Sequence, residues 1–330
     1  MSTHSVSRLF IAIALGVLGF AQASAICNAS EVLVADRLTN SVYRYDSTGG
    51  FLSVLINDNV NLNQPDGLAV SPDHTKLYVA SSQNNQIVAY DYNYAAGTAA
   101  NPTVFATAAQ GLAFPNAMSF SQDGTKLYVA NLGGGGITQL NAAGGNAGAP
   151  IGGGTSFAFS GLAFAPGGEL LAGGFDGNTV AKSNVAITAT SDFVGPSAAL
   201  AGAAGVMVNG NDLYVAGLFT GFVQKFNATT GALDPSFNVS GLAFPQGVLL
   251  APDGNSLLVG VLGFVAGSGN IARYGFDGTS LGVFAASQIN PALGFTEATT
   301  MLVVPEPASW GLAAIALAAL GFIARRRARR

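Results

Sequence analysis

A short phrase of alternating apolar and polar residues recurs five times along the middle of the chain. The copies share a small residue at the same place, spaced 42 to 50 residues from the next copy: Gly67, Ala117, Gly161, Gly205 and Gly247. In each copy a short alternating run meets a turn such as Pro-Asp or Asp-Gly, and a second run follows, such as Leu77 to Ala80. Period-two alternation between turn residues predicts paired β-strands.

Two further strands are expected in each repeat. A third run follows the second at a regular spacing, as in QIVAYD from Gln86 and NIARYGF from Asn270. A fourth run is visible from Thr103 and from Leu281. Four short strands per 40 to 50 residues is typical of a β-propeller blade. The second strand occurs six times, starting at Leu33, Leu77, Leu127, Leu170, Leu213 and Leu257. We therefore predict an all-β fold, a six-bladed β-propeller over residues 26–304.

The first repeat lacks its own innermost strand, because its second strand begins close to the expected mature N-terminus. An apolar run at residues 299–303 stands alone after the sixth repeat. We expect this C-terminal strand to complete the first blade, which would close the ring and remove the open sheet edges.

The N-terminus predicts a secretory signal peptide over residues 1–25. Arg8 gives a weak positive start, residues 9–20 are uncharged, and Ala23 and Ala25 fit the small-x-small cleavage rule. Cys27 follows Ile26, which is wrong for a lipoprotein anchor, so we interpret it as a lone free thiol.

The C-terminus combines a short motif, an apolar stretch and a basic end. Val304, Pro305, Glu306 and Pro307 open it, and residues 308–324 are uncharged, about 26 Å as a helix and just long enough to span a membrane. An arginine cluster follows, expected to stay cytoplasmic: Arg325, Arg326, Arg327, Arg329 and Arg330. These elements resemble a PEP-CTERM sorting signal over residues 304–330, which implies an exported bacterial protein processed by an exosortase-type protease. An ordinary C-terminal membrane anchor is the alternative.

Charge and composition exclude several classes of protein. The apolar share of 49% excludes intrinsic disorder, and one cysteine allows neither an internal disulfide nor a cysteine-based zinc site. Setting aside Arg8 and the five terminal arginines leaves 7 Lys and Arg against 17 Asp and Glu. The excess of acidic residues in this part of the chain argues against nucleic-acid binding, because phosphates are bound by clustered Lys and Arg. His4 and His74 are the only histidines, which leaves little for histidine-dependent catalysis.

The phrases PDGLAVSPD and LYVA resemble NHL and YVTN propeller repeats, and more loosely the gluconolactonase-like propellers, over residues 28–304. The resemblance implies a fold more than a function, because propellers host many activities. Residues at the start of each innermost strand should ring the channel: Asp66, Asn116, Ser160, Ala204, Gln246 and, as the sixth, Glu297.

Oxygen-bearing side chains in such a ring are ligands that Ca²⁺ accepts, so Glu297, Asp66, Asn116 and Gln246 are candidate metal ligands. Gluconolactonase-like enzymes hold a divalent metal at this place; Asn116 is similar to the Asn of their Pro-Asn-Gly pattern and Glu297 to their first-blade glutamate. Ser160 and Ala204 depart from that pattern, and the alternative is that Asp66 and Asn116 cap turns while Glu297 is solvated.

Two functions follow. The first is a non-catalytic binding or scaffold protein of the cell envelope or extracellular matrix, transiently anchored in the inner membrane and then contacting a polysaccharide or an envelope protein. The motivation is the tail and the absence of a nucleophile–base pair. The second is a metal-dependent hydrolase of lactones or sugar derivatives. No cofactor is certain in either case, Ca²⁺ or another divalent cation being the candidate.

Overall fold

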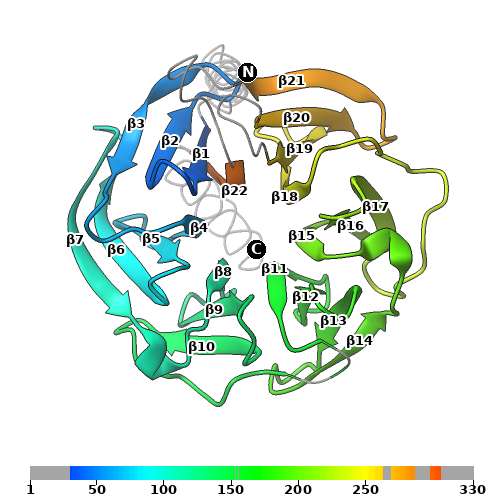
Figure 1. The fold of residues 1–330 in the computed structure, drawn as a ribbon, viewed down its shortest axis with the longest axis horizontal. Coiled ribbons are helices and arrows are strands. Elements are labelled where there is room, and N and C mark those ends of the chain that lie inside the picture. The colour runs from blue at the N-terminus through cyan, green and yellow to red at the C-terminus, as the bar shows by residue number, and fades with distance from the viewer. Residues whose placement is uncertain (1–29, 153, 155, 263–268, 287–297, 306–330) are drawn as a thin grey trace, which may run out of the picture.

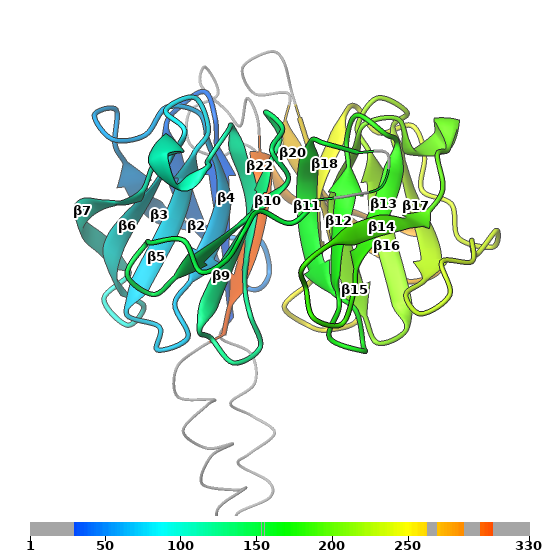
Figure 2. The same ribbon diagram turned by 90° about the horizontal axis from the view of Figure 1, so that it is seen from below.

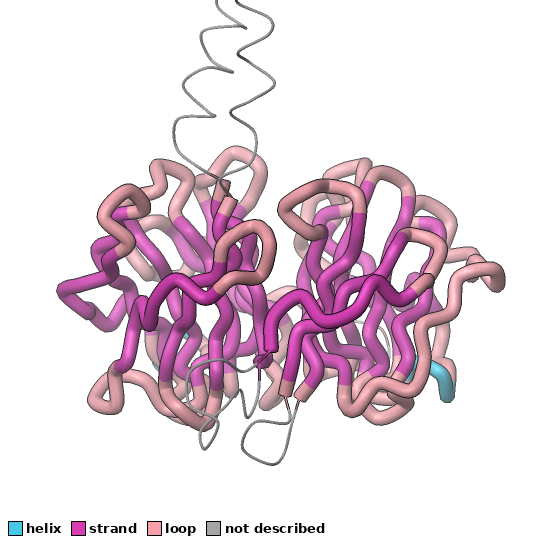
Figure 3. Tube along the Cα trace, turned by 90° about the horizontal axis from the view of Figure 1, so that it is seen from above, coloured by secondary structure: helices cyan, strands magenta, loops and turns pink. Residues whose placement is uncertain are grey.

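The computed structural model describes residues 30–152, 154, 156–262, 269–286 and 298–305. Six antiparallel sheets stand around a central channel, each radiating outward from an innermost strand (Figure 1). Strands make up most of the described chain (Figure 3), and its only helical elements are two 3-10 turns, η1 (Ala108–Gln110) and η2 (Ala198–Leu200). The six-bladed all-β propeller is therefore confirmed.

The blades follow one another along the chain, with the innermost strand given first in each sheet. The first three blades are formed by β22 (Ala298–Val304), β1 (Glu31–Asp36), β2 (Ser41–Tyr45) and β3 (Phe51–Asn57); β4 (Pro65–Val70), β5 (Lys76–Ser81), β6 (Gln86–Asn93) and β7 (Thr98–Ala106); and β8 (Pro115–Phe120), β9 (Lys126–Asn131) and β10 (Ile137–Asn141).

The other three blades close the circle back to the first (Figure 1). Their strands are β11 (Phe159–Phe164), β12 (Leu170–Gly174), β13 (Thr179–Ser183) and β14 (Thr190–Val194); β15 (Ala203–Asn209), β16 (Asp212–Gly217) and β17 (Phe222–Asn227); and β18 (Pro245–Leu250), β19 (Ser256–Val261), β20 (Asn270–Gly275) and β21 (Ser280–Ala286).

The first blade draws its strands from both ends of the described chain. β22 pairs antiparallel with β1, with Glu31 opposite Val304 and Val34 opposite Met301. β22 runs along the channel from one end to the other. The chain therefore leaves the propeller at Pro305, beside the start of β1.

The third and fifth blades differ from the expectation of four strands, because three strands form each of their sheets in the described residues. In place of a fourth strand, isolated bridges such as Ile137 to Ile151 and Val223 to Val239 touch the outer edge. Residues 142–154 are rich in Gly and Ala, and Pro235 interrupts residues 228–242. Gly, Ala and Pro are poor strand formers, which explains the loss of a continuous outer strand.

The core lies between neighbouring blades rather than at one centre. Leu33 and Val42 of the first blade pack with Leu77 and Val88 of the second, all of them buried. Side chains on the two faces of each twisted sheet alternate between its two neighbours, as the period of two requires. The ring of blades is thus held by six such interfaces in turn.

We call the end of the propeller at which the innermost strands β4, β8, β11, β15 and β18 begin the mouth face, and the other end the opposite face (Figure 2). On the opposite face the Pro-Asp and Asp-Gly turns are stabilised locally. Ser121 Oγ donates to Asp123 Oδ1 at 2.6 Å, and the Thr125 N–H donates to the same oxygen at 3.0 Å. Hydrogen bonds from Ser121 and Thr125 lower the pKa of Asp123 to about 2.

No helix within the described residues is both long and apolar enough to cross a membrane. The expected signal peptide and the expected helix over residues 308–324 both lie outside those residues.

Candidate functional site

A β-bulge near the start of five innermost strands sets the geometry of the mouth face. The pairing register shifts between Pro65 and Leu68 in β4, and the equivalent shift recurs in β8, β11, β15 and β18. A bulge turns a side chain out of the regular alternation. The residue at the bulge ends up at the channel in each blade, and these residues form what we call the mouth ring: Asp66, Asn116, Ser160, Ala204 and Gln246.

The recurring glycines of the sequence repeat stand at the same bulges, and the close approach of neighbouring strands explains them. A Cβ on Gly67 would lie 1.9 Å from the backbone oxygen of Asn116 in the next blade. The same test gives 2.3 Å from Gly161 to the Ala204 oxygen and 2.4 Å from Gly205 to the Gln246 oxygen. Glycine is therefore required sterically at Gly67, Gly161 and Gly205, where one innermost strand contacts the next.

The backbone is strained just before three of these strands. Gln64, Phe114 and Phe244 have φ values of 56°, 50° and 53°, and each directly precedes the proline that opens its strand. Side chains with a Cβ rarely adopt this left-handed conformation, and such strain gathers at functional sites.

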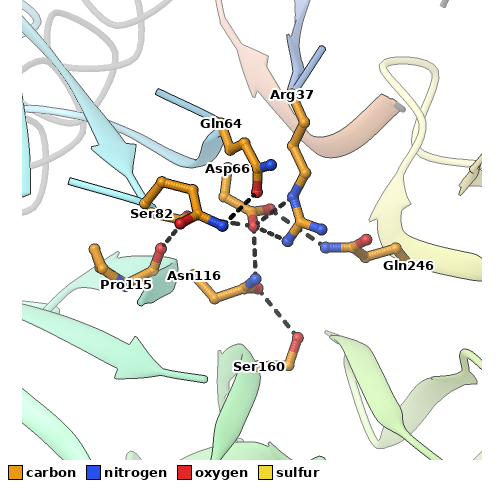
Figure 4. Close-up of polar contacts among 9 residues, drawn as sticks. Arg37, Gln64, Asp66, Ser82, Pro115, Asn116, Ser160 and Gln246 are labelled. Atoms are coloured by element: carbon orange, nitrogen blue, oxygen red, sulfur yellow. Dashed lines mark hydrogen bonds and ion pairs between the residues drawn. The ribbon is translucent and has the colours of Figure 1, made fainter. Parts of the chain in front are cut away.

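Asp66 is the hub of the mouth ring (Figure 4). Its carboxylate is completely buried and forms an ion pair with Arg37, whose Nε donates to Oδ2 at 3.1 Å. Asn116 Nδ2 donates to the same oxygen at 2.7 Å, and Gln246 Nε2 donates to Oδ1 at 3.3 Å. Ser82 Oγ lies 3.5 Å from Oδ2. Asp66 thus connects side chains from four blades.

The carboxylate also orients the amides around it. Only the amide nitrogens can face Asp66 favourably, because a carbonyl oxygen would be repelled by the negative charge. The Asn116 carbonyl is accordingly turned away, and it accepts a hydrogen bond from Ser160 Oγ at 3.1 Å (Figure 4). The mouth ring is therefore polarised, with donors turned toward Asp66 and acceptors turned away from it.

Arg37 was missed by the sequence reasoning. It lies directly after β1, and its guanidinium carbon is 5.8 Å from the centre of the Phe114 ring, within cation–π range. Its side chain is 14% exposed, so the ion pair with Asp66 is largely removed from water. The sequence offered one signal for this residue: it is a lone arginine between two strands, in a chain with only 9% charged residues.

The structure brings together three of the four candidate metal ligands: Asp66, Asn116 and Gln246. Glu297 lies outside the described residues. In β22, Ala298 pairs with Asp36 and Thr300 pairs with Ala35. This register places residue 299 at the position in its strand that Asp66 has in β4. The described residues contain no cluster of three or more His, Cys, Asp or Glu that could hold a metal.

The three described candidate ligands, Asp66, Asn116 and Gln246, do not present the oxygen atoms that a divalent cation needs. They offer one carboxylate, which already faces a guanidinium, and two amides that turn N–H groups toward it. A cation needs several oxygens aimed at one point. The metal site that includes Glu297 stays a prediction.

Three phenylalanines are exposed in loops of the mouth face. Phe157 and Phe219 are 71% and 61% exposed, and both lie in loops at this end of the blades. Phe219 packs edge-on against Phe175, with ring centres 5.5 Å apart. Phe244, also partly exposed, directly precedes β18. Several large exposed rings at one end of a domain are typical of a contact surface.

A cavity of about 280 Å³ occupies the channel behind the mouth ring. Asn116, Ser160 and Gln246 line one end of it, and Phe164 and Val208, near the ends of β11 and β15, line the other. It therefore runs along the channel from the mouth ring toward the opposite face.

The residues of the two terminal signals lie largely outside the structure. Val304 ends β22, where it is buried, and Pro305 follows it on the opposite face. Glu306 and Pro307, the arginine cluster at residues 325–330, and Ala23 and Ala25 are outside the described residues.

Comparison with known proteins supports the two halves of this description. Residues 22–167 match the family described as SMP-30/Gluconolactonase/LRE-like region, and residues 303–330 match the PEP-CTERM protein-sorting motif. No curated protein matches the chain.

Solved structures resemble the propeller at low sequence identity. A chain of a nidogen/laminin complex matches with a TM-score of 0.63 and 13% identity, over 83% of this chain and 98% of that one. Putative 6-phosphogluconolactonases from Bacteroides uniformis and Bacteroides fragilis match with TM-scores of 0.55 and 0.57 and identities of 18% and 16%. They cover 77% and 84% of this chain and 82% and 98% of their own.

Identities this low show likeness of fold alone. The sorting motif, in contrast, indicates export, envelope or extracellular sorting, and processing by an exosortase. The chain is thus a six-bladed β-propeller with a gluconolactonase-like region over its first half and a PEP-CTERM sorting motif at its end.

Proposed function

We propose that this chain is an exported, non-catalytic binding protein of the cell envelope or extracellular matrix, which contacts a glycan or a protein with its mouth face. The observation that carries the proposal is the ion pair between Arg37 and Asp66. It neutralises the one carboxylate among the described mouth-ring residues, and the amides of Asn116 and Gln246 are already donating to it. A carboxylate whose oxygens already face a guanidinium and two amide donors is a poor metal ligand.

The distribution of apolar side chains supports binding at the same face. Phe157, Phe219 and Phe244 are exposed in mouth-face loops of the fourth, fifth and sixth blades. Aromatic rings give large contact areas at a small cost in side-chain entropy, and they stack on sugar rings as well as on protein side chains.

The direction in which the chain leaves the propeller supports a tethered arrangement. Pro305 lies at the opposite face, next to Glu31 at the other end of the described chain. A segment attached there leaves the mouth face free. We propose that β22 closes the ring, that residues 1–25 are removed after Ala25, and that residues 308–324 hold the protein in the inner membrane until an exosortase-type protease releases the tail.

The second candidate is a metal-dependent hydrolase of lactones or sugar derivatives. The match of residues 22–167 to the gluconolactonase-like family favours it, as does the meeting of Asp66, Asn116 and Gln246 at the channel. In this case Glu297 would have to supply a second carboxylate, and Arg37 would have to release Asp66.

Melting temperatures measured in EDTA and in saturating Ca²⁺ separate the two candidates. A ligand at a hundred times its Kd stabilises the folded state by about 2.7 kcal/mol, which shifts the melt clearly. If the chain is a binding protein in which Arg37 neutralises Asp66, we expect the melting temperatures in EDTA and in Ca²⁺ to be equal. An upward shift that Glu297→Gln abolishes would overturn the proposal in favour of the hydrolase.

The sorting half of the proposal has its own test. The mass of the protein recovered from the cell surface should correspond to a chain that begins at Ile26 and lacks the apolar segment and the arginine cluster. Recovery of surface protein with the whole tail attached would contradict processing.

A further inference from the structure

The channel cavity combines an apolar wall with one polar end. Two residues beyond the mouth ring, each innermost strand places an apolar side chain on the cavity: Leu68, Met118, Leu162, Val206, Val248 and Met301. We call these six residues the apolar ring.

The polar end offers a hydrogen-bond acceptor that the protein does not use. Gln246 is 6% exposed and donates its amide N–H to Asp66, so its carbonyl oxygen is turned away from the carboxylate. No described residue donates a hydrogen bond to that oxygen, although the neighbouring Asn116 carbonyl accepts one from Ser160. A hydroxyl group arriving with a ligand would take the place of water as the donor to this oxygen.

The size of the cavity limits what could enter. An apolar cavity of about 150 Å³ is large enough to bind benzene. At about 280 Å³ the channel has room for one ring with a short chain.

From the unused Gln246 carbonyl at the end of the apolar ring, we propose that the channel binds a small apolar molecule carrying one hydrogen-bond donor, such as a hydroxyl group, at one end. The apolar body would lie along the apolar ring, and the donor would bind the Gln246 oxygen. This site is distinct from the mouth-face surface, and it does not depend on whether the protein is sorted as proposed.

Two isomeric probes test the proposal on the purified full-length protein. 4-Propylphenol and 4-ethylanisole have the same formula and similar shapes, but the first carries an O–H donor and the second does not. Their dissociation constants are measured by ligand-detected NMR titration. A hydrogen bond of ordinary strength makes the phenol bind roughly tenfold tighter. Equal binding of the isomers, or binding of neither, would overturn the proposal.

Variants place the binding in the channel. Gln246→Met keeps an unbranched side chain and removes the acceptor, so the tenfold preference should vanish while the ether still binds. Gln122→Met changes an exposed turn residue on the opposite face and should keep the preference. If Gln246→Met does not fold, Val208→Phe carries the test, because it fills the cavity and should weaken both probes equally. Unchanged binding to Val208→Phe would show that the probes bind elsewhere.

Discussion

Asp66 on the mouth face and the turn aspartates Asp73 and Asp123 on the opposite face are held in opposite ways. On the opposite face, Asp73 and Asp123 accept hydrogen bonds from residues two positions away in the chain, and their carboxylates are exposed. On the mouth face, Asp66 is fully buried, and its partners stand 29, 50 and 180 residues away. The first kind of contact shapes a turn within one blade, whereas the second joins blades to one another. The loss of one mouth-face partner should therefore disturb the whole ring.

The largest effect is expected from the mouth-face arginine. Arg37→Leu leaves the buried Asp66 carboxylate without its counter-charge, which should lower the free energy of unfolding by about 3–5 kcal/mol. Arg273→Leu is the matched control, because its partner Asp253 lies in an opposite-face turn and both side chains are about one-third exposed. An exposed ion pair contributes roughly 0–1 kcal/mol. Equal losses in urea titrations of the two variants would contradict the contrast between the faces.

A smaller effect is expected from the close approach of the innermost strands. Gly67→Ala brings a Cβ against the Asn116 backbone oxygen, so one of the two strands has to shift. Overpacking of this kind costs about 1–3 kcal/mol, and it should also lengthen the contact between Asn116 and Asp66. Gly195→Ala is the control, since a Cβ there meets no atom within 4 Å. Equal melting temperatures of the two variants would show that the innermost strands are not packed as tightly as the structure describes.

The smallest effect is expected from an opposite-face turn, and it should depend on pH. The folded-state pKa of Asp123 is about 2 against an ordinary 3.8, so its ionised form stabilises the fold. That contribution is complete above about pH 4 and is lost as the pH falls toward 2. Asp123→Asn should therefore be less stable than the wild type at pH 6, and the difference should close near pH 2. Denaturant titrations at several pH values check this, and a constant difference would rule the explanation out.

Much of the fold could be predicted because its determinants are local. The turn after Val70 is set by Pro72 and Asp73, and the strands on either side of it alternate with a period of two. The missing outer strands of the third and fifth blades were not foreseen. Their segments follow the expected spacing, but they are too rich in Gly and Ala, or interrupted by Pro235, to form a continuous strand.

The candidate site was predicted only in part. The repeat aligned Asp66, Asn116 and Gln246 at equivalent positions, and the ring geometry of a propeller brings equivalent positions together. Arg37 has no counterpart in the other repeats that would have marked it. Its role depends on the reach of its side chain from the first blade to the second.

The sequence alone therefore determined the repeat, the blade count and the PEP-CTERM sorting motif, because strand alternation, turn chemistry and a contiguous motif act over a few residues. Only the tertiary structure decided that Asp66 is neutralised by Arg37 and that the amides around it turn their acceptors away. The reason is that a buried charge takes whichever partners the closed ring brings within hydrogen-bond distance, and those partners lie up to 180 residues apart in the chain.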